Sequence, residues 1–230
     1  MPENTSALHL VLSGDPALFA IVRLSLMVSL SAALFAALIG VPLGALIALT
    51  RFRGKEPVIV VLNALMGLPP VVVGLAVYLG LSRSGPLGSW RVLFTPQAMV
   101  IAQTVLVTPI IAALTRQTIE DLWVEYRDEL TAMHVGPLRR VLTLVWDARF
   151  SLVTALLAGF GRAAAEVGAI IIVGGNIAGF TRTMTTAIAL ETSKGNLPLA
   201  IGLGIVLMFI VMSISALAWG ARRAGERFAG

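Results

Sequence analysis

The chain has 230 residues, of which 57% are apolar and 13% are charged, and it contains no cysteine. A typical soluble domain carries about 25% charged residues, so this composition excludes an ordinary soluble domain and favours a chain embedded in a bilayer. Without cysteine the chain forms no disulfide and offers no thiolate to a metal. The basic residues behind the net charge of +5 lie between apolar runs, which indicates membrane topology and not nucleic-acid binding.

Five apolar segments are long enough to form membrane-spanning helices, since a hydrocarbon core about 30 Å thick takes roughly 20 helical residues. In chain order they are about 16–49, 57–81, 97–114, 150–173 and 197–219. The first segment has a favourable helix start, with Asp15 as N-cap and Pro16 at the first helical position. No basic residue precedes Arg23, so we expect no removable signal peptide. The sequence therefore predicts an all-α integral membrane protein with residues 1–230 as a single transmembrane domain.

Prolines interrupt several of these segments: Pro42 lies in the first, Pro69-Pro70 in the second and Pro109 in the third. Each proline removes a backbone hydrogen bond and kinks or unwinds its helix, and in a bilayer the freed carbonyls need protein or a wet cavity. Broken helices therefore favour a translocation path over a static anchor bundle, which is the alternative. Gly40 and Gly44 form a G-x-x-x-G pattern, which permits close helix contact within the chain or between subunits.

A long loop, residues 115–149, separates the third and fourth spans and contains many of the acidic residues of the chain. The segment 125–133 has mixed polarity and no helix breaker, so it predicts a short helix that is broken at Gly136-Pro137. A second short helix is predicted over 138–146, with Arg139 and Arg140 on it. Two interpretations stay open for this loop. It is either a docking surface for a soluble partner or a solvated loop with an interfacial helix.

The basic residues give the orientation, because cytoplasmic loops of membrane proteins are enriched in Lys and Arg. With the N-terminus outside, the inner side carries Arg51, Arg53, Lys55, Arg116, Arg127, Arg139, Arg140, Arg149, Arg222, Arg223 and Arg227. The outer side then carries only Arg83, Arg91, Arg182 and Lys194. We therefore predict an external N-terminus and a cytoplasmic C-terminus, as an odd number of spans requires.

Two charged residues of the fourth span, Arg162 and Glu166, are four residues apart and share a helical face. Each charge near the bilayer centre costs roughly 2.5–3.5 kcal/mol on insertion scales, which favours a mutual ion pair. That pair is either structural, locking two helices, or functional, attracting an anion or gating a path. Gly174, Gly175 and Asn176 follow on the outer side. They form either a turn at which the chain leaves the membrane, which we call the exit turn, or a site where backbone N–H groups bind an oxyanion.

No group of residues in the sequence has the pattern expected of an enzyme. Neither a phosphate loop nor an H-E-x-x-H motif occurs, so we predict no catalytic residue, no metal site and no cofactor site in this chain. Beyond the fourth span, residues 183–193 predict a short helix that ends at Gly195, flanked by Arg182 and Lys194. Those two charges either hold a protein outside the membrane or solvate the loop.

Five strings carry a resemblance to a known family: GLPPVVVGL (67–75), LSRSGPLG (81–88), GFGRAAAEVGA (159–169), VGGNI (173–177) and TTAIALETSKGN (185–196). They resemble the tungstate-type permeases among the type I ATP-binding-cassette (ABC) importers, and the similarity covers nearly the whole chain from about Leu12. The resemblance implies the type I ABC importer permease fold, with five transmembrane helices and a cytoplasmic coupling helix.

The same resemblance gives the loop 115–149 a role, since the coupling helix of such importers sits in a groove of the ATPase. The family pattern is Glu-Ala-Ala, three residues and then Gly, followed by a basic stretch. Ala132 and Gly136 fit the third position and the Gly. Glu129 fits the Glu position only in a register that leaves Gly136 one residue late. The implied docking residues are Glu129, Leu130, Thr131, Ala132, Gly136, Pro137, Arg139 and Arg140.

The resemblance also implies a function, a location and partners. The chain would be the permease subunit of an oxyanion importer, with tungstate as the first choice, in the inner membrane of a prokaryotic cell. Its partners would be a second copy in a homodimer, two ATPase subunits that bind ATP and Mg, and an extracytoplasmic tungstate-binding protein. The alternatives are a molybdate or sulfate importer permease and, from other classes, a stand-alone channel or carrier or a membrane scaffold.

Overall fold

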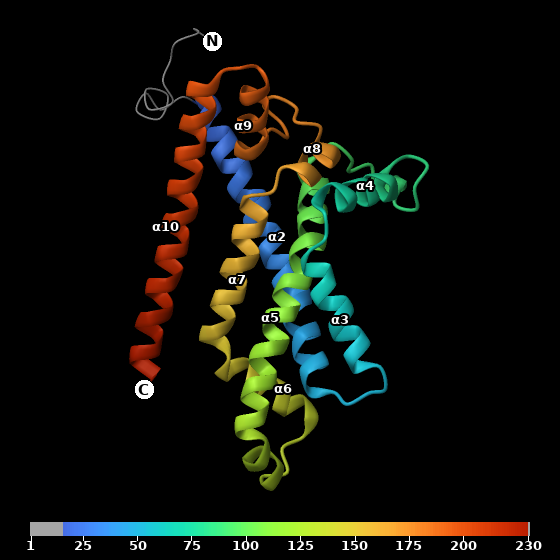
Figure 1. Ribbon diagram of the computed structural model, residues 1–230, viewed down its shortest axis with the longest axis vertical. Helices are drawn as coiled ribbons and strands as arrows, with labels where there is room; N and C mark the ends of the chain where they lie inside the picture. The colour runs from blue at the N-terminus through green and yellow to red at the C-terminus, as the bar shows by residue number, and fades with distance from the viewer. Residues whose placement is uncertain (1–15, 230) are drawn as a thin grey trace.

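The computed structural model describes residues 16–229, and within that range all regular structure is helical (Figure 1). The helices are α2 (Pro16–Leu49), α3 (Lys55–Met66), α4 (Pro70–Leu81), the 3₁₀ helix η1 (Gly88–Trp90), α5 (Pro96–Ala132), α6 (Pro137–Asp147), α7 (Arg149–Ala164), α8 (Gly168–Gly174), α9 (Met184–Ser193) and α10 (Leu197–Ala229). The expected N-cap Asp15 and the N-terminal segment for which no signal peptide was expected lie outside the described residues.

Three helices, α2, α5 and α10, are each long and apolar enough to cross a membrane, and up to five spans result if bent helix pairs count as one span each. The helix α2 coincides with the segment 16–49 expected from sequence. The segment 57–81 is not one helix, because α3 and α4 meet at a bend of 99°. Pro69 is extended there and Pro70 opens α4, so the two prolines end one helix and start the next.

The two remaining single prolines do not unwind their helices. Pro42 lies inside α2 and Pro109 inside α5, and both helices continue past them. A proline in a long helix removes one hydrogen bond, while its neighbours on either side keep the helix in register. The sequence predicted that each proline kinks or unwinds its helix. The helical segment is interrupted at Pro69-Pro70, whereas Pro42 and Pro109 do not interrupt theirs.

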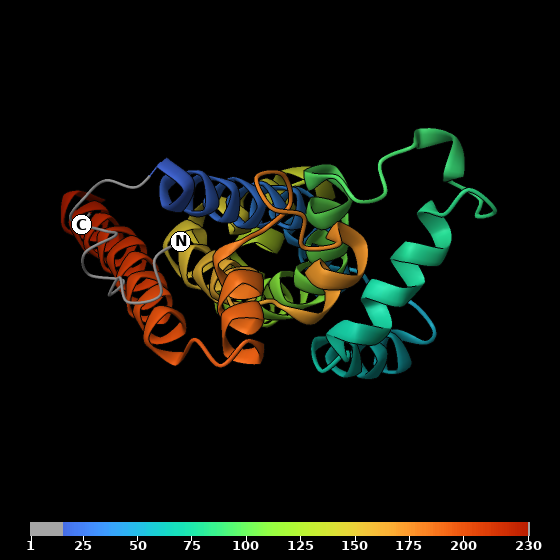
Figure 2. The ribbon, with the colours of Figure 1, turned by 90° about the horizontal axis from the view of Figure 1, so that it is seen from above.

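The centre of the bundle is the packing of α2 against α5, with α7 beside them (Figure 1). Seen from above, α10 lies at one edge and α3 with α4 at the opposite edge (Figure 2). Two glycines allow the close approach: a Cβ on Gly40 would lie 3.0 Å from the Thr108 carbonyl oxygen, and one on Gly44 would lie 2.4 Å from that of Ala112. The G-x-x-x-G pattern thus serves a contact between two helices of the same chain.

The loop 115–149 is largely helical, which corrects the expectation of a short separate helix over 125–133. Those residues are the last turns of α5, which continues without a break to Ala132. The continuation is stabilised because Ile119 is buried and Trp123 and Tyr126 pack against a cluster that also contains Leu144 of α6. The break at Gly136-Pro137 is present, since α6 begins at Pro137.

The fourth and fifth segments also differ in their bounds from the sequence expectation. The helix α7 ends at Ala164, and α8 resumes at Gly168, so the segment 150–173 contains a break of three residues. The helix α10 continues past position 219 to Ala229. Most of its large apolar side chains are exposed, among them Ile201, Met208 and Phe209, as expected of a helix that faces lipid or another subunit.

Candidate functional site

Polar side chains gather at the break between α7 and α8, inside an otherwise apolar bundle. The buried polar residues of the bundle are Ser29, Gln103, Thr115, Glu166, Thr181, Thr183, Thr185 and Thr186, and all except Thr115 come from the helices and turns around this break or its outer end. Irregular backbone at membrane depth is tolerated only where protein or a wet cavity satisfies its hydrogen bonds. The polar break between α7 and α8 is therefore the candidate functional site.

The predicted pair of Arg162 and Glu166 is formed at this break. The Glu166 side chain is 3% exposed, and one carboxylate oxygen lies 3.2 Å from Arg162 Nη1. The other accepts a hydrogen bond of 3.0 Å from the Ala169 N–H in the first turn of α8. The sequence predicted that Glu166 would lie on one continuous helix with Arg162. Instead, Glu166 lies beyond the end of α7. The carboxylate thus joins the last turn of α7 to the start of α8.

Side chains from neighbouring elements donate hydrogen bonds to backbone carbonyls at the break. Gln103 on α5 donates from Nε2 to the Ala163 carbonyl at 2.8 Å. Thr185 on α9 donates from Oγ1 to the Glu166 carbonyl at 2.8 Å. Sequence analysis missed both residues, although an amide side chain at position 103 within an apolar segment was a usable signal. The break is therefore a defined feature of the fold, stabilised from two sides.

The break between α7 and α8 lies against the other broken segment. A Cβ on Gly74 of α4 would be 2.7 Å from the Ala169 Cα of α8, and one on Gly168 would be 2.9 Å from Val71 Cγ2. The first turns of α4 and α8 thus approach closely, with backbone near backbone at Gly74 and Ala169 and the Val71 side chain against Gly168. A displacement of α8 has to displace α4 as well, since close-packed interiors transmit shifts.

Gly174, Gly175 and Asn176 form a tight turn after α8. Gly175 has φ 72° and Asn176 has φ 49°, so the backbone is left-handed at both positions, which suits Gly and Asn. Gly175 donates its N–H to the Ile171 carbonyl at 2.9 Å, and Thr181 donates from Oγ1 to the Gly174 carbonyl at 2.6 Å. Because the Gly175 N–H is already bonded, the geometry favours the exit turn over a backbone oxyanion site here.

The predicted docking residues fall into two groups. Glu129, Thr131, Ala132, Gly136, Pro137 and Arg139 are exposed around the turn between α5 and α6. Leu130 is partly buried against the cluster beneath α6, and Arg140 donates from Nε to the Val135 carbonyl at 2.6 Å while lying over the Trp123 ring. The exposed residues up to Pro137 belong to the turn that we call the α5–α6 tip (residues 129–137), and Arg139 follows it in the first turn of α6. Within the tip the Leu130 side chain points toward the cluster beneath α6, and Arg140 supports the tip from α6.

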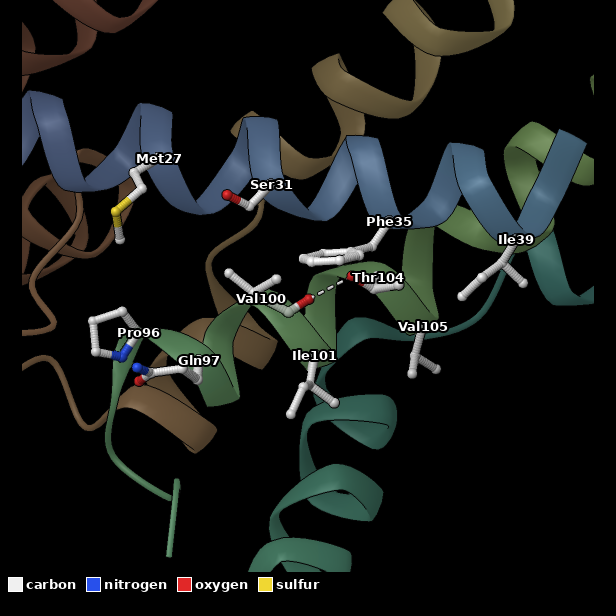
Figure 3. A pocket seen from close by; sticks show the side chains of 10 residues that line it. All are labelled: Met27, Ser31, Phe35, Ile39, Pro96, Gln97, Val100, Ile101, Thr104 and Val105. Carbon is white, nitrogen blue, oxygen red and sulfur yellow. Dashed lines mark hydrogen bonds between the residues drawn. The ribbon is translucent and has the colours of Figure 1, made fainter. Parts of the chain in front are cut away.

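Several cavities of the described chain lie away from the break. An apolar groove of about 540 Å³ runs between α2 and α5, lined by ten residues that include Met27, Phe35 and Ile101 (Figure 3). Thr104 donates there to its own helix, to the Val100 carbonyl, so the groove offers little to a charged solute. A larger pocket of about 790 Å³ at the opposite end from the α5–α6 tip is lined by Arg83, Ser89 and Arg91, among others. Its two guanidinium groups make it the more suitable surface for an anion or an acidic protein.

Comparison with known proteins supplies relatives along most of the chain. No family model matches it. A probable anion ABC transporter permease of Haloferax volcanii is 43% identical over 210 residues, which cover 89% of this chain and 90% of that protein. A tungstate uptake system permease of Peptoclostridium acidaminophilum is 41% identical over 92% of each chain. One of Campylobacter jejuni is 38% identical over 72% of this chain and 69% of its own. Molybdenum and sulfate transport permeases match at lower identity, between 26% and 28%.

Proposed function

The chain belongs to the family of ABC transporter permeases that includes the tungstate uptake permeases, and from that membership we propose that it is the membrane-spanning subunit of an importer of tungstate. The observation that carries the proposal is the identity of 41% with a tungstate uptake permease over 92% of both chains. Molybdate or sulfate import is the second candidate, supported by relatives of lower identity that are named for molybdenum and sulfate.

An importer of this kind needs energy from outside this chain. A dianion that enters a cell against an inside-negative potential meets about 2.3 kcal/mol per charge per 100 mV. The sequence has no phosphate loop, so we propose that two ATPase subunits bind ATP and Mg and dock at the α5–α6 tip. A homodimer of this chain would enclose the path, and a tungstate-binding protein would deliver the anion to the end that carries Arg83 and Arg91.

For the path itself, we propose five spans, with α3 and α4 as one broken span and α7 and α8 as another. The N-terminus then lies outside and the C-terminus in the cytoplasm of a prokaryotic cell. Arg162, whose side chain is 34% exposed in the single subunit, would face the path or the helix interface that gates it. Gly174, Gly175 and Asn176 would form the outer end of the gate element α8.

Uptake measurements test this function. Cells that express the permease with its ATPase and binding protein should accumulate tungstate, and accumulation should stop when the ATPase carries a substitution that prevents ATP hydrolysis. Parallel titrations with molybdate and sulfate rank the anions. Preferential uptake of molybdate or sulfate would make the second candidate correct. Uptake that persists without a working ATPase would identify a channel or carrier, and no uptake with all subunits present in the membrane would favour a scaffold.

A further inference from the structure

The helix α6 carries an apolar stripe that no other part of the described chain covers. Leu138, Leu142 and Trp146 are spaced by four residues and therefore lie on one side of the helix. Their exposed fractions are 71%, 61% and 68%. Three large apolar side chains exposed in a row on a helix of eleven residues indicate a surface that contacts something other than water.

Around its circumference α6 presents three different sides. The side toward the protein contains Leu144, which is fully buried, with Val141 and Val145 packed against the same cluster. The stripe is the next side, and it continues the apolar arc without a polar residue between them. The remaining side holds Arg139, Thr143 and Asp147, which are all exposed. A helix with neighbouring protein, apolar and polar sides suits the boundary between a bilayer and water.

The position of α6 along the bundle matches that boundary. Its axis is bent by 72° from that of α7, so it runs across the direction of the span. It lies at the last turns of α2, where Leu46, Leu49, Leu138 and Val141 line one groove of about 300 Å³. Leu46 belongs to the exposed apolar surface of α2 and is 51% exposed. The stripe therefore continues the apolar surface of a membrane-spanning helix.

The junction between α6 and α7 has the kinds of side chain that are found at membrane interfaces. The Arg149 guanidinium lies 4.9 Å from the Trp146 ring centroid and 4.5 Å from that of Phe150, and it donates to the Trp146 carbonyl at 2.8 Å. Tryptophan is enriched at the level of the lipid headgroups, and arginine can keep its charge in the headgroup layer while its stem lies along apolar groups.

We propose that α6 lies in the membrane interface with Leu138, Leu142 and Trp146 inserted among lipid acyl chains. In the topology proposed above this is the inner leaflet; that assignment and the contact of the ATPase with the tip rest on the proposed function, whereas the lipid contact of the stripe does not. The α5–α6 tip is joined directly to α6 and is bonded to it through Arg140 and Val135. The lipid contact of the stripe therefore fixes the depth of the tip relative to the membrane. The occupant of the stripe is lipid, and the ATPase contacts the tip.

Nitroxide labels can test the contact, because the natural chain has no cysteine and single cysteines can be placed freely. Leu142→Cys labels the stripe and Met133→Cys labels the tip, where the native side chain is 74% exposed. Each labelled permease is reconstituted in liposomes without other subunits. We expect the label at 142 to collide with oxygen at least several-fold more than with a water-soluble nickel chelate, and the label at 133 to show the reverse.

Addition of the ATPase completes the test. It should protect the label at 133 from the nickel chelate and leave the label at 142 unchanged. Free access of the chelate to position 142 overturns the proposal, and so does protection of position 142 only when the ATPase is added. A label at 142 that is immobilised in the absence of ATPase, with no access to oxygen, would assign the stripe to a second copy of the chain and equally overturn it. Leu138→Cys provides a second position on the stripe. Because these measurements need no transport, their failure is distinguishable from a failure of the proposed function.

Discussion

At the scale of single residues, the carboxylate of Glu166 is buried and is held by two different partners. It interacts with one charged partner, Arg162, and with one backbone N–H, that of Ala169. A buried charge that loses its partner is far more costly than a pair that is removed as a whole. The two functions of the carboxylate, pairing and capping α8, can therefore be separated by mutation.

The first prediction separates the structural role of the pair from its role in transport. Arg162→Ala leaves a buried carboxylate unpaired and should lower the folded yield, because breaking a buried pair costs about 3–5 kcal/mol and the partial exposure of Arg162 places it at the lower end. The double change Arg162→Ala with Glu166→Gln removes both charges and keeps an acceptor for Ala169, so the yield should recover. We expect anion uptake to stay low in the double variant.

Yield and uptake measured on the wild type, both single variants and the double variant check this prediction. Full recovery of uptake together with yield would show that the pair is structural only. Single variants with the yield and uptake of the wild type would contradict both roles.

A second residue-scale prediction concerns acid sensitivity at the end of α9. Glu191 accepts a hydrogen bond of 2.9 Å from Lys194 Nζ and one of 3.3 Å from Asn196 Nδ2. The hydrogen bond from Lys194, ahead of the smaller opposing effect of desolvation, lowers the pKa of Glu191 below its ordinary value. A depressed folded-state pKa adds stability above the unfolded value, and this stability is lost as the pH falls through the folded pKa.

Glu191→Gln should therefore lower the thermal midpoint of the detergent-solubilised protein slightly at neutral pH. The difference from the wild type should shrink as the pH falls below about 4.5 and the wild-type carboxylate is protonated. Tryptophan fluorescence during heating at several pH values measures it. A difference that is the same at every pH would show that the charge of Glu191 has no part in it.

At the scale of elements, the bundle combines helices that pass prolines unbroken with segments that are interrupted. The pair α2 and α5 is held by close backbone contact through Gly40 and Gly44. The pair α4 and α8 is likewise in backbone contact, through Gly74 and Ala169, but each of these helices begins at a break. The centre of the fold is thus held by close helix packing, and the broken helices lie beside it.

A matched pair of glycine changes tests the central packing. Gly44→Ala would place a methyl group 2.4 Å from a backbone oxygen of α5, which α2 can relieve only by moving away. We expect a destabilisation of about 1–3 kcal/mol, the usual cost of overpacking. Gly204→Ala in α10 meets nothing within 4 Å and should be neutral or stabilising by up to about 1 kcal/mol.

Thermal unfolding of both glycine variants in detergent measures the difference between them. Equal midpoints for the two variants would contradict the packing described for α2 and α5.

The α5–α6 tip gives the next prediction. Ala132→Asp with Gly136→Arg should abolish co-purification of the ATPase, while the permease still inserts into the membrane. Both residues are exposed, and a side chain at 136 meets nothing within 4 Å, so the changes carry no folding penalty that would obscure the result. Ser84→Arg, exposed at the other end of the molecule, is the control and should leave co-purification intact. Undiminished co-purification by the tip variant would place the ATPase elsewhere.

At the scale of the whole molecule, the basic residues that sequence analysis assigned to one side lie at one end of the bundle. The end of α2, the start of α3, the α5–α6 tip and the C-terminal part of α10 are found together there, and α4, α9 and the start of α10 lie toward the other end (Figure 1). Lys and Arg are thus distributed unequally between the two ends, which is the pattern from which we predict that this end is cytoplasmic.

Cysteine labelling tests which end is inside. A cysteine at Gly136 should be cytoplasmic and one at Ser84 external, so an impermeant reagent added to intact cells should label only position 84. Arg53→Cys samples the loop between α2 and α3 and should also be cytoplasmic; the neighbouring Gly54 is unsuitable because it has φ 94°, where a side chain is strained. External labelling at 136 or 53 would reverse the proposed topology.

The sequence by itself determined the features that depend on local composition and chemistry. Segment length predicted the apolar spans, and the proline ring predicted the break at Pro69-Pro70. The spacing of four residues predicted the pairing of Arg162 with Glu166. Each of these features depends on residues within one short stretch of chain. The family could be predicted for the same reason, since long strings of residues carry it.

Only the tertiary structure decided the features that depend on contacts between distant segments. The continuation of α5 to Ala132 depends on packing against α6, and the stability of the break after α7 depends on Gln103 and Thr185 from other elements. The exposure of Leu138, Leu142 and Trp146 on α6 depends on the burial of Leu144 on another side of the same helix against α2 and α5. Burial is a property of the assembled molecule, so a pattern of apolar residues along the chain cannot tell which of them meet protein and which meet lipid.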